Sequence, residues 1–146
     1  MTTPKIVKQI VECFKAGNKA LIIGNGGSMA MASHMMAEFI GIYENKRALP
    51  AIALTDITTM SALANDVGYR NVFSRQVEAL GKKGDVLITF STSGTSFNII
   101  EAIYEARLRG IDVVDMPRIK GTTQEIQENQ LHLTHEICRQ VKQQFE

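Results

Sequence analysis

Residues 85–96 read DVLITFSTSGTS, and this stretch decides the fold. Its first part, Val86–Phe90, is an apolar run of the kind found in strands that are buried on both faces of a parallel sheet. Its second part is a loop of hydroxyl side chains, and a helical pattern begins at Phe97. A buried strand that leads through a short loop into a helix indicates a βα unit.

The loop after this strand carries groups that bind phosphate. Its hydroxyl side chains belong to Ser91, Thr92, Ser93, Thr95 and Ser96. Because a helix begins directly afterwards, side-chain O–H donors, backbone N–H groups and the positive end of a helix dipole meet at one point. The loop has no lysine and no carboxylate for a metal ion, which argues against a nucleoside triphosphate. It therefore predicts a site for a phosphate monoester such as a sugar phosphate.

Strands and helices alternate along the rest of the chain. Strands are predicted at 20–23, 50–55, 86–90 and 111–114, and helices from Pro4 to Gly17 and at 29–42, 58–64, 72–80, 98–109 and 124–144. This order predicts an α/β fold, a three-layer α/β/α sandwich around a doubly wound, mainly parallel sheet. No linker or repeat interrupts it, so we expect residues 1–146 to form a single domain.

Composition excludes several classes of partner. The chain has a net charge of +1 with dispersed Lys and Arg, so we expect no nucleic-acid partner. No apolar run reaches about 18 residues, and the N-terminus lacks the apolar core of a signal peptide, so we expect no membrane association. Cys13 and Cys138 are far apart without CxxC spacing. This pattern suits packed thiols in a reducing compartment and predicts a cytoplasmic location.

A second loop, Gly24–Ser28, reads GNGGS and also follows a predicted strand. Glycines allow close approach of the backbone to a ligand, and Ser28 can either cap the next helix or bind a phosphate oxygen. In an open parallel sheet, ligands bind beyond the carboxyl ends of the strands. The loops 24–28, 55–58 and 91–96 all fall at that edge, which favours phosphate binding over a simple turn.

His34 and Glu38 are four residues apart on the predicted helix 29–42, so they share one face. Their neighbours are mostly apolar, and a polar pair in such surroundings needs partners. One interpretation is a hydrogen-bonded pair in the core. The other is half of a metal site, or a general base.

Gln127 and His135 lie on the last predicted helix, separated by about 80° around its axis, so both can reach one cavity. His132 points elsewhere and is expected at the surface. Together with His34 and Glu38, the pair can form a nitrogen and oxygen site that suits zinc or a similar divalent ion.

Asp66 lies in a predicted loop between Asn65 and Gly68. It can form an Asx turn, or its carboxylate can accept hydrogen bonds from sugar hydroxyls.

These residues resemble the sugar isomerase (SIS) domain proteins, and within them the phosphoheptose isomerases. The resemblance rests on the segments 24–28 with His34 and Glu38, 50–55 with 64–69 and 73–76, 91–96, and 126–128 with His135. It implies an isomerase that interconverts sedoheptulose 7-phosphate and D-glycero-D-manno-heptose 7-phosphate through an enediol.

The resemblance also implies roles for individual residues. The phosphate ligands would be Ser28, Ser91, Ser93 and Ser96, with Thr92 nearby. Asn25, Asp66 and Gln127 would contact the sugar. Glu38 would be the catalytic base and His135 the catalytic acid. One Zn²⁺ per subunit would be held by His34, Glu38, Gln127 and His135. Relatives of this kind are homo-oligomers, and we expect a tetramer with the apolar helix 29–42 at an interface.

The sequence departs from the family pattern at several positions. Ile42 stands where an Arg is familiar, Met31 where an Asp is frequent, Glu125 where an Arg precedes Ile-Gln-Glu, and Thr95 where the phosphate loop has Asn. These changes keep open an isomerase for another sugar phosphate. A non-catalytic SIS protein, either a phosphosugar-binding regulator or a partner of a replication initiator, is the rival from another class. Because Glu38 and His135 are both retained, the enzyme is favoured.

Relatives usually have a further loop, helix and strand between Val113 and Thr123. Here Asp112–Pro117 must serve as the fourth strand and as the lead into the last helix. Either the unit is missing from the protein, or a mobile stretch is missing from this sequence. We favour the second interpretation, since the loss of a strand would expose the core whereas a mobile loop costs little.

Overall fold

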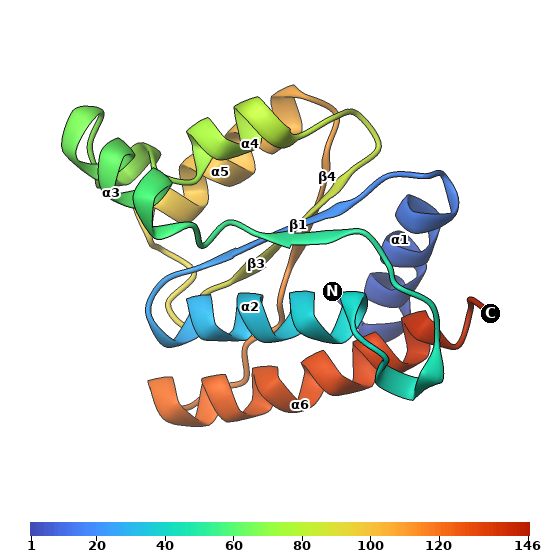
Figure 1. Cartoon of the computed structure of the whole chain (residues 1–146). Helices are drawn as coiled ribbons and strands as arrows, with labels where there is room; N and C mark the ends of the chain where they lie inside the picture. The colour runs from blue at the N-terminus through green and yellow to red at the C-terminus, as the bar shows by residue number, and fades with distance from the viewer.

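The computed structural model describes residues 1–146 and has a four-stranded sheet with strand order β2-β1-β3-β4 (Figure 1). The strands are β1 (Ala20–Gly24), β2 (Ala51–Ala53), β3 (Val86–Phe90) and β4 (Asp112–Asp115). The helices are α1 (Thr3–Lys15), α2 (Gly27–Ile40), α3 (Ile57–Asp66), α4 (Ser74–Leu80), α5 (Phe97–Leu108) and α6 (Thr123–Lys142), with 3₁₀ helices η1 (Tyr43–Asn45) and η2 (Tyr69–Asn71). All neighbouring strands are parallel, which confirms the predicted α/β fold.

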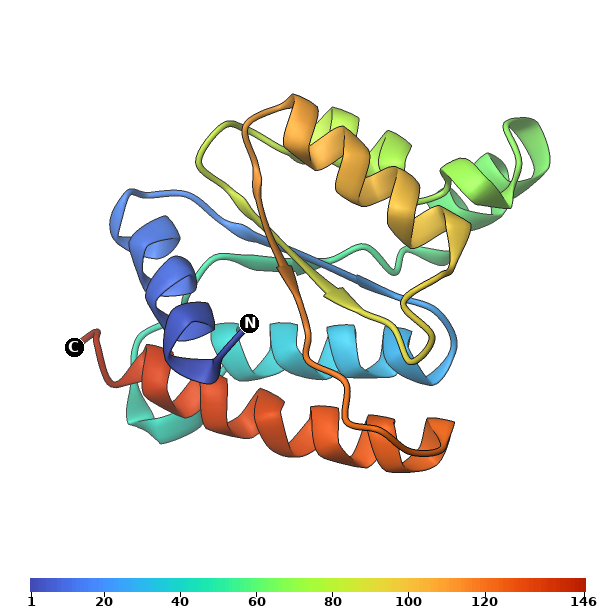
Figure 2. The same cartoon turned by 180° about the vertical axis from the view of Figure 1, so that it is seen from behind.

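Helices cover both faces of the sheet, as Figures 1 and 2 show. Helices α1, α2 and α6 pack on one face, and α3, α4 and α5 lie on the other. Alternate residues of β1 divide between the two cores, with Ala20 and Ile22 in the first and Leu21 and Ile23 in the second. Because both faces are covered, the strands are apolar throughout instead of alternating. None of the helices has the length and apolar character needed to cross a membrane.

Two predicted helices near the candidate site, α2 and α3, have different boundaries in the structure. Helix α2 begins at Gly27 and not at Met29, because Gly26 adopts φ 54° and ψ −123° and starts the helix there. Ser28 therefore lies in the first turn and is not the N-cap. Helix α3 begins one residue earlier than predicted, because the Asp56 side chain caps it by accepting from the Thr59 N–H at 2.8 Å, and it ends two residues later, at Asp66.

Because α3 is longer than predicted, the predicted site residue Asp66 lies in this helix. Asn65 and Asp66 occupy the last turn of this helix and do not lie in a loop. Edge strand β2 is shorter than predicted: it covers Ala51–Ala53, while Pro50 and Thr55 fall outside it. Strand β3 matches its prediction at both ends, and β4 is shifted by one residue.

A buried carboxylate joins the starts of β1 and β3. The Asp85 side chain is 1% exposed and accepts from the Lys19 ammonium at 2.6 Å, from the Lys19 and Lys82 N–H groups at 3.1 and 2.8 Å, and from the Asn18 amide at 3.0 Å. Burial by itself would raise the pKa of Asp85, but the Lys19 ammonium and these hydrogen bonds outweigh it and lower the pKa.

We predict that Asp85→Ala lowers the free energy of unfolding by about 3 kcal/mol, because it leaves a half-buried ammonium and several N–H donors without a partner. The lowered pKa means that the carboxylate stabilises the fold above the unfolded-state pKa of about 3.9, and that this stabilisation is lost as pH falls through the folded-state value. Urea unfolding between pH 7 and pH 2 measures both effects. Asp112→Asn, which alters an exposed carboxylate on β4, is the control. Equal stabilities of the two variants at pH 7 would contradict the prediction.

Candidate functional site

The candidate site lies where the strand order changes direction. From β1 the chain passes through α2 to β2 on one side, whereas β3 pairs with β1 on the other side. The loops that follow β1 and β3 therefore diverge and leave a crevice at the carboxyl ends of the strands, which is the usual ligand position in such sheets.

A pair of side-chain amides connects these two loops. Asn25 donates to Asn98 at 2.9 Å and Asn98 donates back to Asn25 at 2.8 Å. The Tyr69 hydroxyl adds a third hydrogen bond, to the Asn25 amide oxygen at 3.2 Å. These residues line a pocket of about 350 Å³ together with Arg70, Ser96 and Phe97. Sequence reasoning missed Asn98, in the first turn of α5, and Tyr69, in η2, since neither position carries a signal of partners that lie more than 40 residues away.

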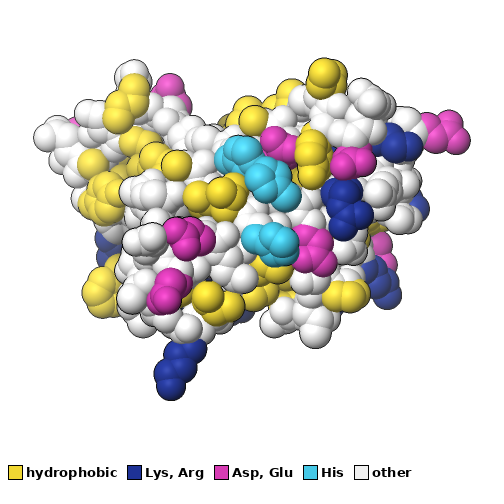
Figure 3. Space-filling view, turned by 90° about the horizontal axis from the view of Figure 1, so that it is seen from below, with side chains coloured by type: hydrophobic (Ala, Val, Ile, Leu, Met, Phe, Trp, Pro, Cys, Tyr) yellow, Lys and Arg dark blue, Asp and Glu magenta, His cyan; other side chains and the backbone are white.

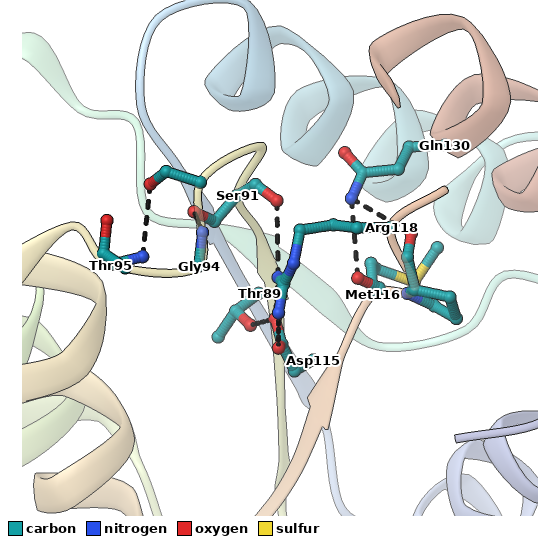
Figure 4. A network of polar contacts seen from close by, with 10 residues as sticks. Thr89, Ser91, Gly94, Thr95, Asp115, Met116, Arg118 and Gln130 are labelled. Atoms are coloured by element: carbon teal, nitrogen blue, oxygen red, sulfur yellow. Dashed lines mark hydrogen bonds and ion pairs between the residues drawn. The ribbon is translucent and has the colours of Figure 1, made fainter. Parts of the chain in front are cut away.

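The hydroxyl loop is held in a turn by its own side chains (Figure 4). The Ser91 hydroxyl accepts from the Gly94 N–H at 2.9 Å, and the Ser93 hydroxyl accepts from the Thr95 N–H at 3.1 Å. Each hydroxyl keeps its own proton for donation to a ligand. Ser96 precedes α5 without a side-chain capping bond, so its hydroxyl is also available.

The predicted sugar and phosphate ligands are not all gathered at this crevice. Ser28 is buried in the first turn of α2, and Thr92 is half-buried in the hydroxyl loop. Asp66 is exposed at the end of α3, and its only side-chain hydrogen bond comes from Asn65. The structure thus shows Asn25 and Ser96 in one pocket and places Asp66 outside it.

A second set of polar residues meets where α2 packs against α6. The two helices lie side by side and run in the same direction (Figure 1). The Nε2 atoms of His34 and His135 are 2.9 Å apart, and His34 Nε2 lies 3.7 Å from Glu38 Oε1. The imidazole rings meet edge to face, with centroids 4.9 Å apart. Figure 3, which looks onto this layer, shows histidine side chains reaching the surface beside acidic ones.

Gln127 belongs to the same interface between α2 and α6, at the end where both helices begin. A Cβ atom on Gly27 would lie only 2.5 Å from Gln127 Nε2, so the amide packs directly on the first turn of α2. Gly27 precedes His34 by two helical turns, and Gln127 precedes His135 by about two. The parallel helices therefore place the Gln127 amide at the start of the interface and the imidazole pair at its middle.

The donor atoms at this interface fit a divalent cation. The ligand atoms of His34, Glu38 and His135 all lie within 4.8 Å of one another. Glu38 Oε2 is buried and has no hydrogen-bond partner, which is costly for a carboxylate unless a further group binds it. Two imidazoles and one carboxylate form a donor set typical of zinc sites that keep an open position.

A tyrosine that sequence reasoning missed borders this cluster. The Tyr43 hydroxyl donates to the His135 carbonyl at 3.5 Å, and the two rings are 6.2 Å apart. Burial, and then the carboxylates of Glu44 and Glu38, raise the pKa of Tyr43. It therefore remains a neutral hydroxyl at neutral pH.

The fold and the hydroxyl loop define a class. Residues 4–116 match the family model described as SIS domain. A solved structure of phosphoheptose isomerase from Neisseria gonorrhoeae is similar with a TM-score of 0.90 and 35% identity, and it covers 97% of this chain and 85% of that chain. A structure of a phosphoheptose isomerase from Francisella tularensis is similar with a TM-score of 0.92 and 31% identity, over the same shares of both chains.

Sequence comparison narrows the class. Phosphoheptose isomerase of a Synechocystis strain is 43% identical over 94% of this chain and 80% of that protein. The Sodalis glossinidius phosphoheptose isomerase is 53% identical, but the matched region covers 78% of this chain and 59% of that protein. The chain belongs to the phosphoheptose isomerase family of SIS domain proteins.

Gly24, the last residue of β1, and Gly27, the first residue of α2, have different surroundings, and we predict different effects of alanine at the two positions. A Cβ on Gly24 would lie 2.5 Å from the Ser28 backbone, which cannot move without distorting the helix. Gly24→Ala should therefore cost about 2 kcal/mol of unfolding free energy. Gly27→Ala meets only the mobile end of Gln127, so stability should change by less than about 0.5 kcal/mol while the Gln127 amide is displaced. Urea unfolding and the side-chain amide NMR signals measure the two effects, and equal destabilisation by both variants would contradict the prediction.

Proposed function

We propose that this chain is an aldose–ketose isomerase that interconverts sedoheptulose 7-phosphate and D-glycero-D-manno-heptose 7-phosphate. The observation that carries the proposal is the meeting of His34, Glu38 and His135 at the interface of α2 and α6. The chain belongs to the phosphoheptose isomerase family, and this supports the same conclusion. The rise along α2 from Ser28 to His34 is about 9 Å, which an extended seven-carbon sugar phosphate can span.

The substrate would be anchored by its phosphate, far from the reacting carbons. Ser28, Ser91, Ser93 and Ser96 would bind the phosphate oxygens, with Thr92 close by. Asn25 and Gln127 would bind sugar hydroxyls, whereas Asp66 lies outside the pocket and has no role in this proposal. This remote binding energy positions C1 and C2 for reaction, since fixed orientation removes much of the entropic barrier.

Glu38 would move the proton between the two carbons. Its carboxylate takes the proton from C2 of the aldose and returns it to C1 of the enediol, and the reverse path converts the ketose. His135 would donate a proton to the carbonyl oxygen and recover one from the neighbouring hydroxyl. The unpartnered Glu38 Oε2 supports this role, because no protein hydrogen bond competes for its lone pairs.

The donor set also supports one Zn²⁺ per subunit. His34, Glu38 and His135 would hold the ion, and the Gln127 side chain would have to leave Gly27 to reach it as a fourth ligand. When bound, the ion supplies a Lewis acid that polarises the substrate carbonyl. The clustered ligand atoms and the unpartnered Glu38 oxygen support this part of the proposal.

A cytoplasmic homotetramer completes the proposal. Cys13 and Cys138 are free and buried, and burial, followed by the charge of Asp85, raises the pKa of Cys13 to about 12. Unreactive reduced thiols suit the cytoplasm. Apolar side chains at Phe97, Tyr104 and Leu108 of α5 are more than 60% exposed, which supports burial against other subunits.

We predict that Glu38→Gln lowers kcat by about 1,000-fold while sugar phosphate still binds, since the amide cannot accept the proton. Exchange of solvent deuterium into sedoheptulose 7-phosphate, followed by NMR, measures turnover, and calorimetry measures binding. Glu12→Gln, at an exposed position of α1, is the control. Full activity of Glu38→Gln would remove this residue from the role, and binding without turnover in the unaltered protein would instead favour a phosphosugar-binding regulator.

We predict that His135→Ala weakens zinc binding by more than about 100-fold, because it removes one of three clustered ligands. Chelator competition with Zn²⁺ and the absorption spectrum of the Co²⁺ form measure this directly, without an activity assay. His132→Ala is the matched control, since His132 is exposed on the same helix. Equal affinities of the two variants would show that the ion is bound elsewhere.

A further inference from the structure

An arginine outside the family's phosphate motif lies against the hydroxyl loop. Arg118 belongs to the connection between β4 and α6, and its guanidinium packs on Gly94, where a Cβ atom would lie 3.0 Å from Cζ and Nη2 (Figure 4). Arg118 Nη1 also donates to the Ser91 carbonyl at 3.4 Å. A cation therefore borders a loop that carries hydroxyls but no charge of its own.

The two residues before Arg118 are held by hydrogen bonds with β3 and α6. The Met116 N–H donates to the Thr89 carbonyl at 2.9 Å, and Met116 is fully buried. The buried Gln130 amide on α6 donates to the Pro117 carbonyl at 3.3 Å and to the Met116 carbonyl at 3.5 Å. These bonds keep the start of the connection beside the hydroxyl loop, so the position of Arg118 is set by the fold.

Only part of the guanidinium is used by the protein. Nη1 donates to Asp115 Oδ1 at 3.1 Å and Nη2 donates to Asp115 Oδ2 at 2.8 Å. A guanidinium has five N–H donors. The N–H on Nε and the second N–H on Nη2 have no partner, and both nitrogens lie within 3.3 Å of the Gly94 Cβ position. Parallel N–H groups of this kind bind two oxygens of one phosphate.

Asp115 holds the guanidinium and also opposes an anion. Its carboxylate is 42% exposed, and it accepts a further hydrogen bond from the Thr89 hydroxyl at 2.9 Å. A partly exposed ion pair between residues three apart adds little to stability. The pair therefore orients Arg118, while the negative charge of Asp115 weakens the attraction of the site for a second anion.

We propose that Arg118 is a phosphate ligand: its Nε and Nη2 donors bind the phosphate monoester that the hydroxyl loop receives, and Asp115 orients it. The proposal rests on the sugar phosphate isomerase function and adds a charged residue to the hydroxyl site. It makes Arg118 a determinant of specificity for a dianionic phosphate over the uncharged sugar.

Calorimetric titration with inorganic phosphate and with sedoheptulose 7-phosphate tests the proposal. Arg118→Gln should weaken both affinities by about 10-fold or more and raise KM by a similar factor, with a smaller change in kcat. Arg118→Lys should fall between, because an ammonium keeps the charge without the paired donors. Arg109→Gln is the matched control. Arg109 also pairs with a carboxylate, that of Glu105 at 2.6 Å, but it lies at the C-terminal end of α5, and the hydroxyl loop precedes the N-terminal end.

The variant Asp115→Asn distinguishes phosphate binding by Arg118 from a purely structural role of the Arg118–Asp115 ion pair. If Arg118 binds phosphate, this variant should keep or increase the affinity for inorganic phosphate, because it removes a competing negative charge. Unchanged phosphate affinity in Arg118→Gln would overturn the proposal. Equal losses of affinity and of unfolding temperature in Arg118→Gln and Asp115→Asn would also overturn it, in favour of a purely structural pair. Titration with inorganic phosphate does not depend on turnover. If the isomerase proposal is wrong, turnover is absent but Arg118→Gln still weakens phosphate binding; if the Arg118 proposal is wrong, phosphate affinity is unchanged.

Discussion

The packing of α2 against α6 is the contact on which the candidate site depends. Three contacts fix the register of these parallel helices: Gly27 against Gln127, His34 against His135, and the Lys142 ammonium, which donates to the Gly41 carbonyl at 2.8 Å. Their positions advance by about two turns on each helix. A slip of one residue along α6 would rotate His135 by about 100° and separate the imidazoles.

The far end of this interface combines burial with charge. Lys142 is fully buried, and this burial lowers its pKa. In addition to the Gly41 carbonyl, the Lys142 ammonium donates to the Arg47 carbonyl at 2.9 Å. It thereby satisfies a carbonyl at the end of α2 and holds the chain that leads toward β2. Beside it, burial and then Glu38 raise the pKa of the Cys138 thiol. Glu38, whose Oε2 atom has no hydrogen-bond partner, is thus close enough for its charge to raise the pKa values of both Cys138 and Lys142.

Local pattern explains which elements were predicted well. Strand β3 and its loop were predicted at the right residues, because a run buried on both faces followed by Gly94 has few alternative structures. The start of α2 was wrong by two residues, because Gly26 and not Ser28 adopts the conformation that begins the helix. Asp66 was expected in a loop, but α3 continues through it and ends at the C-cap Val67. Such errors arise where several polar residues can each begin or end a helix.

Local patterns along the chain predicted the alternating strands and helices, the hydroxyl loop at a sheet edge and the polar residues at helical spacing, since each depends on neighbours within about two turns. The folded chain was needed to show that His34 meets His135, that Asn98 pairs with Asn25, and that Arg118 lies on Gly94. The physical reason is separation along the chain: His34 and His135 are 101 residues apart, and only packing of their helices in one core decides whether they meet.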